Sequence, residues 1–194
     1  MSAAPIILGY DPETLRERID PEAALARLEV VQQFRSLSAM NERVSLLRLL
    51  GRLEEAFELA QAAYRQSMFT GSREDILAAR IRRAVVTQFQ GEQDPAKLEL
   101  AVSELTTCAE EALSRDWHVL AGFALQHRGK VHFDRADYQA ALADFEQAEV
   151  LRRRDGVPPD QLASTQFALQ VVRELLGSPG GAPAPIAPSS ELDA

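Results

Sequence analysis

The chain has 194 residues, of which 46% are hydrophobic and 6% aromatic, with a net charge of −8 and a pI of about 5.0. This length fits one domain or a short repeat array, and the apolar share is enough for a sizeable core. The acidic balance argues against a nucleic-acid backbone as the main partner. Ala and Leu are abundant while runs of β-branched residues are few, which favours an all-α fold.

The sequence also indicates a compartment. Cys108 is the only cysteine, so no internal disulfide can form, which suits the reducing cytoplasm. The N-terminal region has no basic residue before Arg16 and no long apolar stretch, so it does not resemble a secretory signal. No apolar run approaches the roughly 20 residues of a membrane-spanning helix. We therefore expect a cytoplasmic protein without a membrane partner.

The first fifty residues predict a flexible end followed by helix. Residues 1–10 carry no clear pattern and are expected to be a flexible N-terminus. Asp11-Pro12 and Asp20-Pro21 each place a capping residue before a proline at the first helical position, although the first opens only a short turn. Apolar residues then recur at steps of three or four over 21–50. This pattern fits one long helix or two helices broken near 36–38, and the sequence does not choose between them.

Further helices follow from Gly51, which is read as a turn residue. Ser72 and Asp75 have the spacing of a capping box, and Asp94-Pro95 restarts a helix after a loop. The predicted helices in this part of the chain span 53–67, 74–89, 95–114, 117–133, 138–154 and 161–176. Gly, Pro, Ser and Ala then dominate, so residues 178–194 are expected to be a disordered tail. The folded domain is predicted over 11–177.

The most informative stretch runs from Gly122 to Leu151 and reads as two helices joined by a tight turn. Small residues fall where the two helices must touch, and large residues fall between them. These residues are Gly129, Phe133, Tyr138, Ala141, Phe145 and Ala148. Their order resembles a tetratricopeptide (TPR) helix–turn–helix unit. Leu125 and Arg128 depart from that pattern, because the family usually has Trp and Leu there.

The spacing of small residues recurs along the chain. Ala56, Ala101 and Ala141 are followed, seven residues later in each case, by Ala63, Cys108 and Ala148. The recurrence predicts three hairpins over 37–67, 74–114 and 117–154, with 161–176 as a capping helix. Such hairpins cannot bury their apolar stripes alone, whereas stacked neighbours can. The resemblance implies a right-handed stack of about three hairpins, although the repeats are longer than the standard unit; a plain antiparallel helix bundle is the alternative.

No residue set typical of an enzyme is present. The three histidines lack the neighbouring Cys, Asp or Glu residues of a zinc site, and Cys108 lies on an apolar stripe. The chain has neither a glycine-rich phosphate loop nor a GxSxG nucleophile motif. The arginine run at 152–154 ends a helix, where cations complement the helix dipole. We therefore expect no catalysis, no metal or other cofactor, and no nucleic-acid partner.

In TPR proteins the first helix of each hairpin lines a concave groove, and the resemblance marks the residues that would face it. The predicted groove residues are Asn41, Ser45, Arg48, Arg82, Val86, Phe89, Gln126, Lys130, Phe133, Gln166, Gln170 and Arg173. Amide side chains can hydrogen-bond a peptide backbone, and Arg and Lys can bind a carboxylate. Lys130 is the cation that we expect to make the principal contact.

The function implied by this groove is binding. We expect a non-catalytic adaptor that holds a peptide or another protein, and the cationic groove residues favour an acidic one. Two alternatives stay open: a regulatory or sensing module of a signalling or transcription-control system, and a self-associating structural protein. The sequence also leaves open whether the C-terminal tail occupies the groove as an internal ligand.

Overall fold

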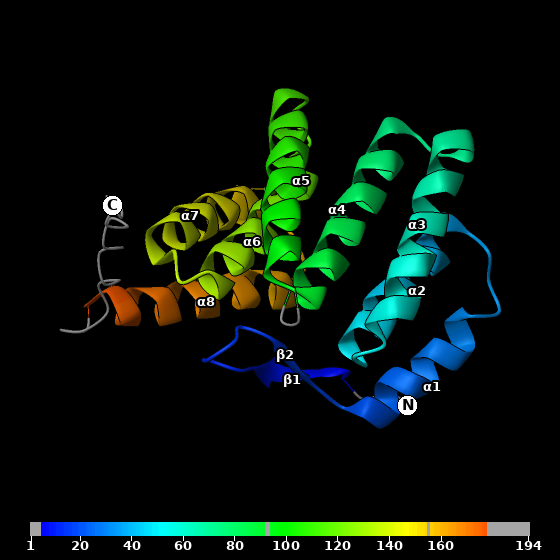
Figure 1. Cartoon of the computed structure of the whole chain (residues 1–194), viewed down its shortest axis with the longest axis horizontal. Helices are drawn as coiled ribbons and strands as arrows, with labels where there is room; N and C mark the ends of the chain where they lie inside the picture. The colour runs from blue at the N-terminus through cyan, green and yellow to red at the C-terminus, as the bar shows by residue number, and fades with distance from the viewer. Residues whose placement is uncertain (1–4, 92–93, 155, 178–194) are drawn as a thin grey trace, which may run out of the picture.

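The computed structural model describes residues 5–91, 94–154 and 156–177. Within these residues a short antiparallel β-hairpin precedes eight helices (Figure 1). The strands are β1 (Ile7–Tyr10) and β2 (Glu17–Ile19), and the helices are α1 (Pro21–Val31), α2 (Leu37–Leu49), α3 (Leu53–Thr70), α4 (Arg73–Gln90), α5 (Pro95–Ser114), α6 (His118–Asp134), α7 (Tyr138–Arg154) and α8 (Pro159–Gly177). The all-α prediction is confirmed.

Side-chain caps start the helices where the sequence predicts them. Asp20 accepts hydrogen bonds from the first backbone N–H groups of α1, and Asp94 does the same for α5. Ser72 and Asp75 form both bonds of the capping box that opens α4. Ser36 caps α2 through the N–H of Ala39. Because these caps satisfy N–H groups that a helix end leaves unpaired, the segment 21–50 forms two helices rather than one.

Three of the interhelical turns share one geometry. Gly51, Asp116 and Ala136 follow α2, α5 and α6, and their φ angles are 73°, 58° and 58°. The next residue in each turn donates its N–H to a carbonyl five residues back. These bonds join Arg52 to Leu47, Trp117 to Ala112 and Asp137 to His132, each at 2.9 Å. This is the long-range bond of a Schellman helix end, in which a left-handed residue lets the chain reverse at once.

Each helix packs against the next along the chain, and α4 also contacts α2 and α6. Figure 1 shows α3, α4 and α5 next to one another, with α2 behind α3, α1 below these two helices, and α8 running beneath α6 and α7. Gly129 on α6 lies directly against the ring of Phe145 on α7, since a Cβ built on Gly129 would come within 2.7 Å of that ring. The small residues Ala141 and Ala148 are fully buried, as the sequence predicted. Whether the hairpins form a TPR-like repeat stack stays a prediction.

The N-terminal segment differs from its prediction. Residues 7–10 were expected to be flexible, yet they form β1 and pair with β2, with Tyr10 opposite Glu17. The hairpin has too few residues for a sequence pattern to reveal it, and an isolated two-stranded hairpin is only marginally stable. Contacts with distant helices hold it in place, as described below. The predictions for residues 1–4 and for the tail 178–194 lie outside the described residues.

Candidate functional site: a cavity between the first helices and the N-terminal hairpin

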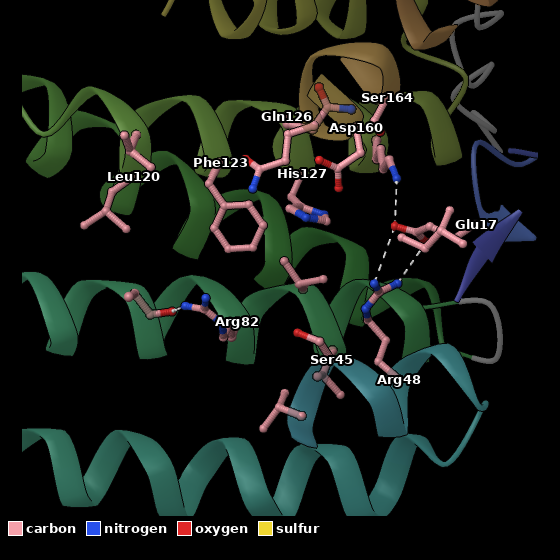
Figure 2. Close-up of a pocket in the computed structure, with 18 of the residues that line it drawn as sticks. Glu17, Ser45, Arg48, Arg82, Leu120, Phe123, Gln126, His127, Asp160 and Ser164 are labelled. Carbon is pink, nitrogen blue, oxygen red and sulfur yellow. Dashed lines mark hydrogen bonds and ion pairs between the residues drawn. The ribbon is translucent and has the colours of Figure 1, made fainter. Parts of the chain in front are cut away.

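A cavity of about 400 Å³ lies where α2, α4, α6, the start of α8 and the β-hairpin meet (Figure 2). Figure 2 shows Phe123, Gln126 and His127 on α6 facing Arg82 on α4 and Ser45 on α2. Valines on α2 and α4 and Leu120 on α6 give the lining an apolar part among its polar and charged side chains. This volume is within the range of pockets that bind small ligands or side chains.

The predicted groove residues on α2, α4 and α6 largely converge here. Those that line the cavity are Ser45, Arg48, Arg82, Val86, Gln126 and Lys130. They come together because α4 packs against both α2 and α6, so residues one helical turn apart on each helix face the same space. Of the remaining predictions, Asn41 is not part of the lining, Phe89 lies under two arginine side chains, and Phe133 is buried against Tyr138.

The predicted groove residues of the last helix do not face the cavity. Gln166, Gln170 and Arg173 are exposed, and their side chains bond Glu149, Glu174 and Glu146 respectively. The cavity instead receives Asp160, Gln161 and Ser164 from α8. These three residues therefore do not take the places on the cavity wall that the repeat register predicted for them. The buried stripe of α8, with Ala168 and Val172, indicates the inward face in the sequence.

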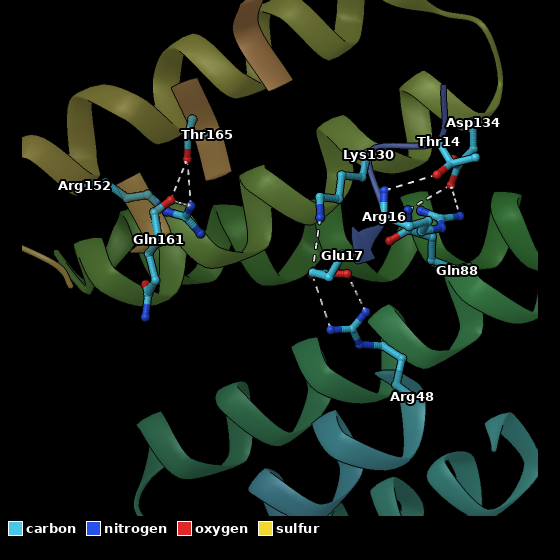
Figure 3. Close-up of polar contacts among 10 residues, drawn as sticks. All are labelled: Thr14, Arg16, Glu17, Arg48, Gln88, Lys130, Asp134, Arg152, Gln161 and Thr165. Carbon is cyan, nitrogen blue, oxygen red and sulfur yellow. Dashed lines mark hydrogen bonds and ion pairs between the residues drawn. The ribbon is translucent and has the colours of Figure 1, made fainter. Parts of the chain in front are cut away.

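Lys130 is not a free cation. Its side chain is only 3% exposed, and its Nζ lies 3.5 Å from Oε1 of Glu17 on β2. Arg48 holds the same carboxylate through Nη1 at 3.1 Å and Nη2 at 3.4 Å (Figure 3). The prediction that Lys130 makes the principal ligand contact is therefore corrected: this part of the face binds the chain's own Glu17. Sequence reasoning missed Glu17 because it lies 113 positions before Lys130 in a segment without a recognisable pattern.

Other contacts fix the hairpin at the same edge. Arg16 Nη2 lies 2.9 Å from Asp134 Oδ2 at the end of α6, and Gln88 on α4 donates to the same oxygen at 2.8 Å. Leu15 is 1% exposed, and the ring of Tyr10 lies against Phe167 on α8. The hairpin thus closes one side of the cavity with side chains from both strands.

Three polar side chains in the wall lack part of their possible partners among the described residues: Arg82 is half-buried, and Gln126 and His127 are buried. Arg82 donates to the carbonyl of Ala78 on its own helix at 3.1 Å and lies over the Phe123 ring, but no carboxylate pairs with it. The two amide atoms of Gln126 have no hydrogen-bond partner, and Nδ1 of His127 has none either. Burial lowers the pKa of His127 well below its usual value, so its imidazole is neutral near pH 7. The cavity therefore offers a ligand one cation that has no carboxylate partner, Arg82, and the neutral hydrogen-bonding groups of Gln126 and His127.

Glu17 makes the stability of the protein depend on acid pH. Burial alone raises the pKa of this carboxyl, but Lys130 and then Arg48 outweigh it and hold the pKa well below 4.5. A carboxylate with a depressed folded-state pKa stabilises the fold fully above about pH 4.5, and this stabilisation falls as the pH drops toward the folded-state pKa.

We expect the free-energy difference between wild type and Glu17→Gln to shrink below pH 4.5 by up to about 1.4 kcal/mol per pH unit. Urea unfolding at several pH values between 7 and 3 measures this difference. Glu146→Gln, at an exposed ion pair, is the control and should show no comparable trend. A constant difference for Glu17→Gln across this range would show that the carboxyl titrates normally in the fold.

Comparison of the sequence with models of known protein families gives no match, and comparison with curated proteins gives none either. Among the described residues, no helix has both the length and the apolar character that crossing a bilayer requires. The same residues contain no cluster of three or more His, Cys, Asp or Glu side chains that could hold a metal ion. Function is therefore inferred from the cavity itself.

Proposed function

We propose that this protein is a non-catalytic, TPR-like adaptor that binds a peptide or another protein on the face shared by α2, α4 and α6. The observation that carries the proposal is the cavity on this face, to which Gln126 brings amide atoms without hydrogen-bond partners and Arg82 brings a guanidinium without a carboxylate partner. A buried polar group without a partner costs free energy. A ligand that supplies the missing partners recovers that free energy and is bound selectively.

The helix packing supports the repeat interpretation. The pairs α2–α3 and α6–α7 are joined by turns of the same Schellman type. In the repeat interpretation α2, α4 and α6 are the first helices of successive hairpins, and α4 contacts both of the others. In a stack of hairpins the first helices form a common inner face. This arrangement accounts for the convergence of Ser45, Arg82 and Gln126 on one cavity.

The charge of the cavity favours an acidic partner segment. The lining holds four basic side chains and two acidic ones in a chain whose net charge is −8. The basic side chains are Arg48, Arg82, Lys130 and Arg152, and the acidic ones are Glu17 and Asp160. A local excess of positive charge attracts a carboxylate, and an arginine can bind it through two parallel N–H bonds. We therefore expect Arg82, rather than Lys130, to make the principal contact with the partner's carboxylate.

A thiol-based catalytic site finds no support at Cys108. This side chain is fully buried within the main core cluster, and burial raises the pKa of its thiol to about 12. A nucleophilic cysteine needs a lowered pKa and access to substrate. The proposal accordingly treats Cys108 as a packing residue of a cytoplasmic binding protein.

Arg82→Met is expected to weaken partner binding by about tenfold or more, because a charge-assisted hydrogen bond contributes roughly 1.5–3 kcal/mol. The neighbouring Arg83→Met is the matched control, since Arg83 pairs with Glu104 and lies over Tyr64, away from the cavity. Affinity capture from the source lysate with quantitative mass spectrometry, followed by calorimetry on the identified partner at two salt concentrations, gives the comparison. If wild type, Arg82→Met and Arg83→Met captured the same amount of partner, the cavity would not be the binding site.

A further inference from the structure

Arg82 differs from the other cations of the cavity in having no hydrogen-bond acceptor outside its own helix. Arg48 and Lys130 share the Glu17 carboxylate. Arg152 donates to the carbonyl of Gln161 at 2.5 Å and to Oγ1 of Thr165 at 2.6 Å (Figure 3). Among the described residues, only Arg82 therefore brings to the cavity a positive charge that is bonded to nothing beyond its own helix. Burial makes such a charge costly until an anion joins it.

The groups around Arg82 define the rest of a ligand. Gln126 is 2% exposed and His127 is 6% exposed, and both line the cavity with unpaired polar atoms. They can donate to or accept from a second polar atom of a ligand. Val85 on α4 and Phe123 on α6 add apolar surface to the wall, and Figure 2 shows Asp160 of α8 beside Gln126 and His127.

We propose that the cavity binds an organic acid that carries a single carboxylate on a small apolar body. The Arg82 guanidinium binds the carboxylate, Gln126 and His127 bond a neighbouring polar atom, and the apolar body packs on Val85 and Phe123. Arg48 and Lys130 already share the Glu17 carboxylate, so Arg82 is the cation left for the ligand and a single carboxylate satisfies it. The inference rests on the cavity of the proposed function and names the chemistry of its ligand. That chemistry is shared by a free small acid and by the carboxyl end of a partner chain.

The test uses the full-length protein labelled with ¹⁵N and the probes hexanoate, hexanamide and inorganic phosphate. Hexanoate is expected to shift the Arg82 Nε–H and Gln126 side-chain amide signals in a saturable way. Hexanamide, which has the same shape without the charge, should bind at least about tenfold more weakly. Phosphate has no apolar body to pack on Val85 and Phe123, so it should cause no saturable shift at the same signals at concentrations that saturate with hexanoate.

Variants of the protein distinguish binding at this cavity from a general effect of adding acid to the sample. Arg82→Met should weaken hexanoate binding by at least about tenfold, whereas Arg83→Met should bind as wild type does. If circular dichroism shows that Arg82→Met does not fold, Gln126→Met replaces it, with its backbone signals as the readout.

A second pair of probes, acetyl-Ala-Ala-Leu with a free carboxylate and the same peptide as its amide, identifies the source of the acid. Tighter binding of the peptide acid than of hexanoate indicates a chain end, and the reverse indicates a free small acid.

Equal binding of hexanoate and hexanamide, or no saturable shift with either hexanoate or the peptide acid, would overturn the inference. So would hexanoate binding that survives in the Arg82 or Gln126 variant. These results differ from a failure of the adaptor proposal. If only the carboxylate inference is wrong, the acid probes do not bind but partner capture still depends on Arg82. If the adaptor proposal is wrong, partner capture does not depend on Arg82.

Discussion

Glu17→Ala is expected to lower the free energy of unfolding by about 3–5 kcal/mol, because it leaves buried charges without their counterion. The Glu17 carboxylate receives hydrogen bonds from Arg48 and an ion pair from Lys130, and the side chains of all three are 10% exposed or less. After the substitution two cations lie together in a site with little water. Desolvation without compensation and repulsion between like charges then act in the same direction.

Urea denaturation followed by circular dichroism at pH 7 measures this loss. The control is Glu146→Ala, which breaks the exposed pair with Arg173 and should cost only about 0–1 kcal/mol. A loss for Glu17→Ala no greater than that of the control would mean that the hairpin is not held by its ion pairs. Adding Lys130→Met to Glu17→Ala should recover part of the lost stability, because it removes one of the stranded charges.

Phe145→Ala is expected to cost about 3–5 kcal/mol, the usual range for truncating a fully buried phenylalanine. The ring is 0% exposed and fills the space that Gly129 leaves on the facing helix. Because glycine has no side chain, Gly129 itself cannot fill the resulting hole. The loss should therefore lie toward the upper part of the range, where a cavity collapses poorly.

Phe69→Ala provides the matched control, since this ring at the end of α3 is 88% exposed and its removal should change stability by no more than about 0.5 kcal/mol. Thermal unfolding and urea denaturation of both variants give the comparison. Similar losses for the two variants would contradict the close packing of α6 on α7, and with it the register read from the small residues in the sequence.

The N-terminal hairpin decides which charges on the face shared by α2, α4 and α6 are available to a ligand. Without Glu17, Arg48 and Lys130 would form a basic surface next to Arg82, suited to a ligand with several carboxylates. With Glu17 in place, two of these cations are bound internally, and Ile7, Tyr10 and Glu17 wall the cavity on that side. We therefore expect binding to depend on Arg82 and Gln126, and the hairpin to act through the shape and charge of the cavity.

Local sequence signals determined most of the helical architecture. Caps such as Ser72 and Asp94 act within a few residues of themselves, and the periodic apolar stripes need only the helix that carries them. The contact of Gly129 with Phe145 was also readable, because both lie in one hairpin where small and large residues alternate by position. Ser45, Arg82 and Gln126 were named from the resemblance to a repeat, and they line one cavity because α4 packs against both α2 and α6.

Tertiary structure alone decided the electrostatics of the site and the inward face of α8. Glu17 joins Arg48 and Lys130 across 31 and 113 positions, and a pairing over such distances leaves no local pattern. The hairpin that carries Glu17 forms only because distant helices supply partners for Arg16, Leu15 and Tyr10. Lys130 therefore reads in the sequence as an available cation, whereas the fold buries it with a counterion and leaves Arg82 without one.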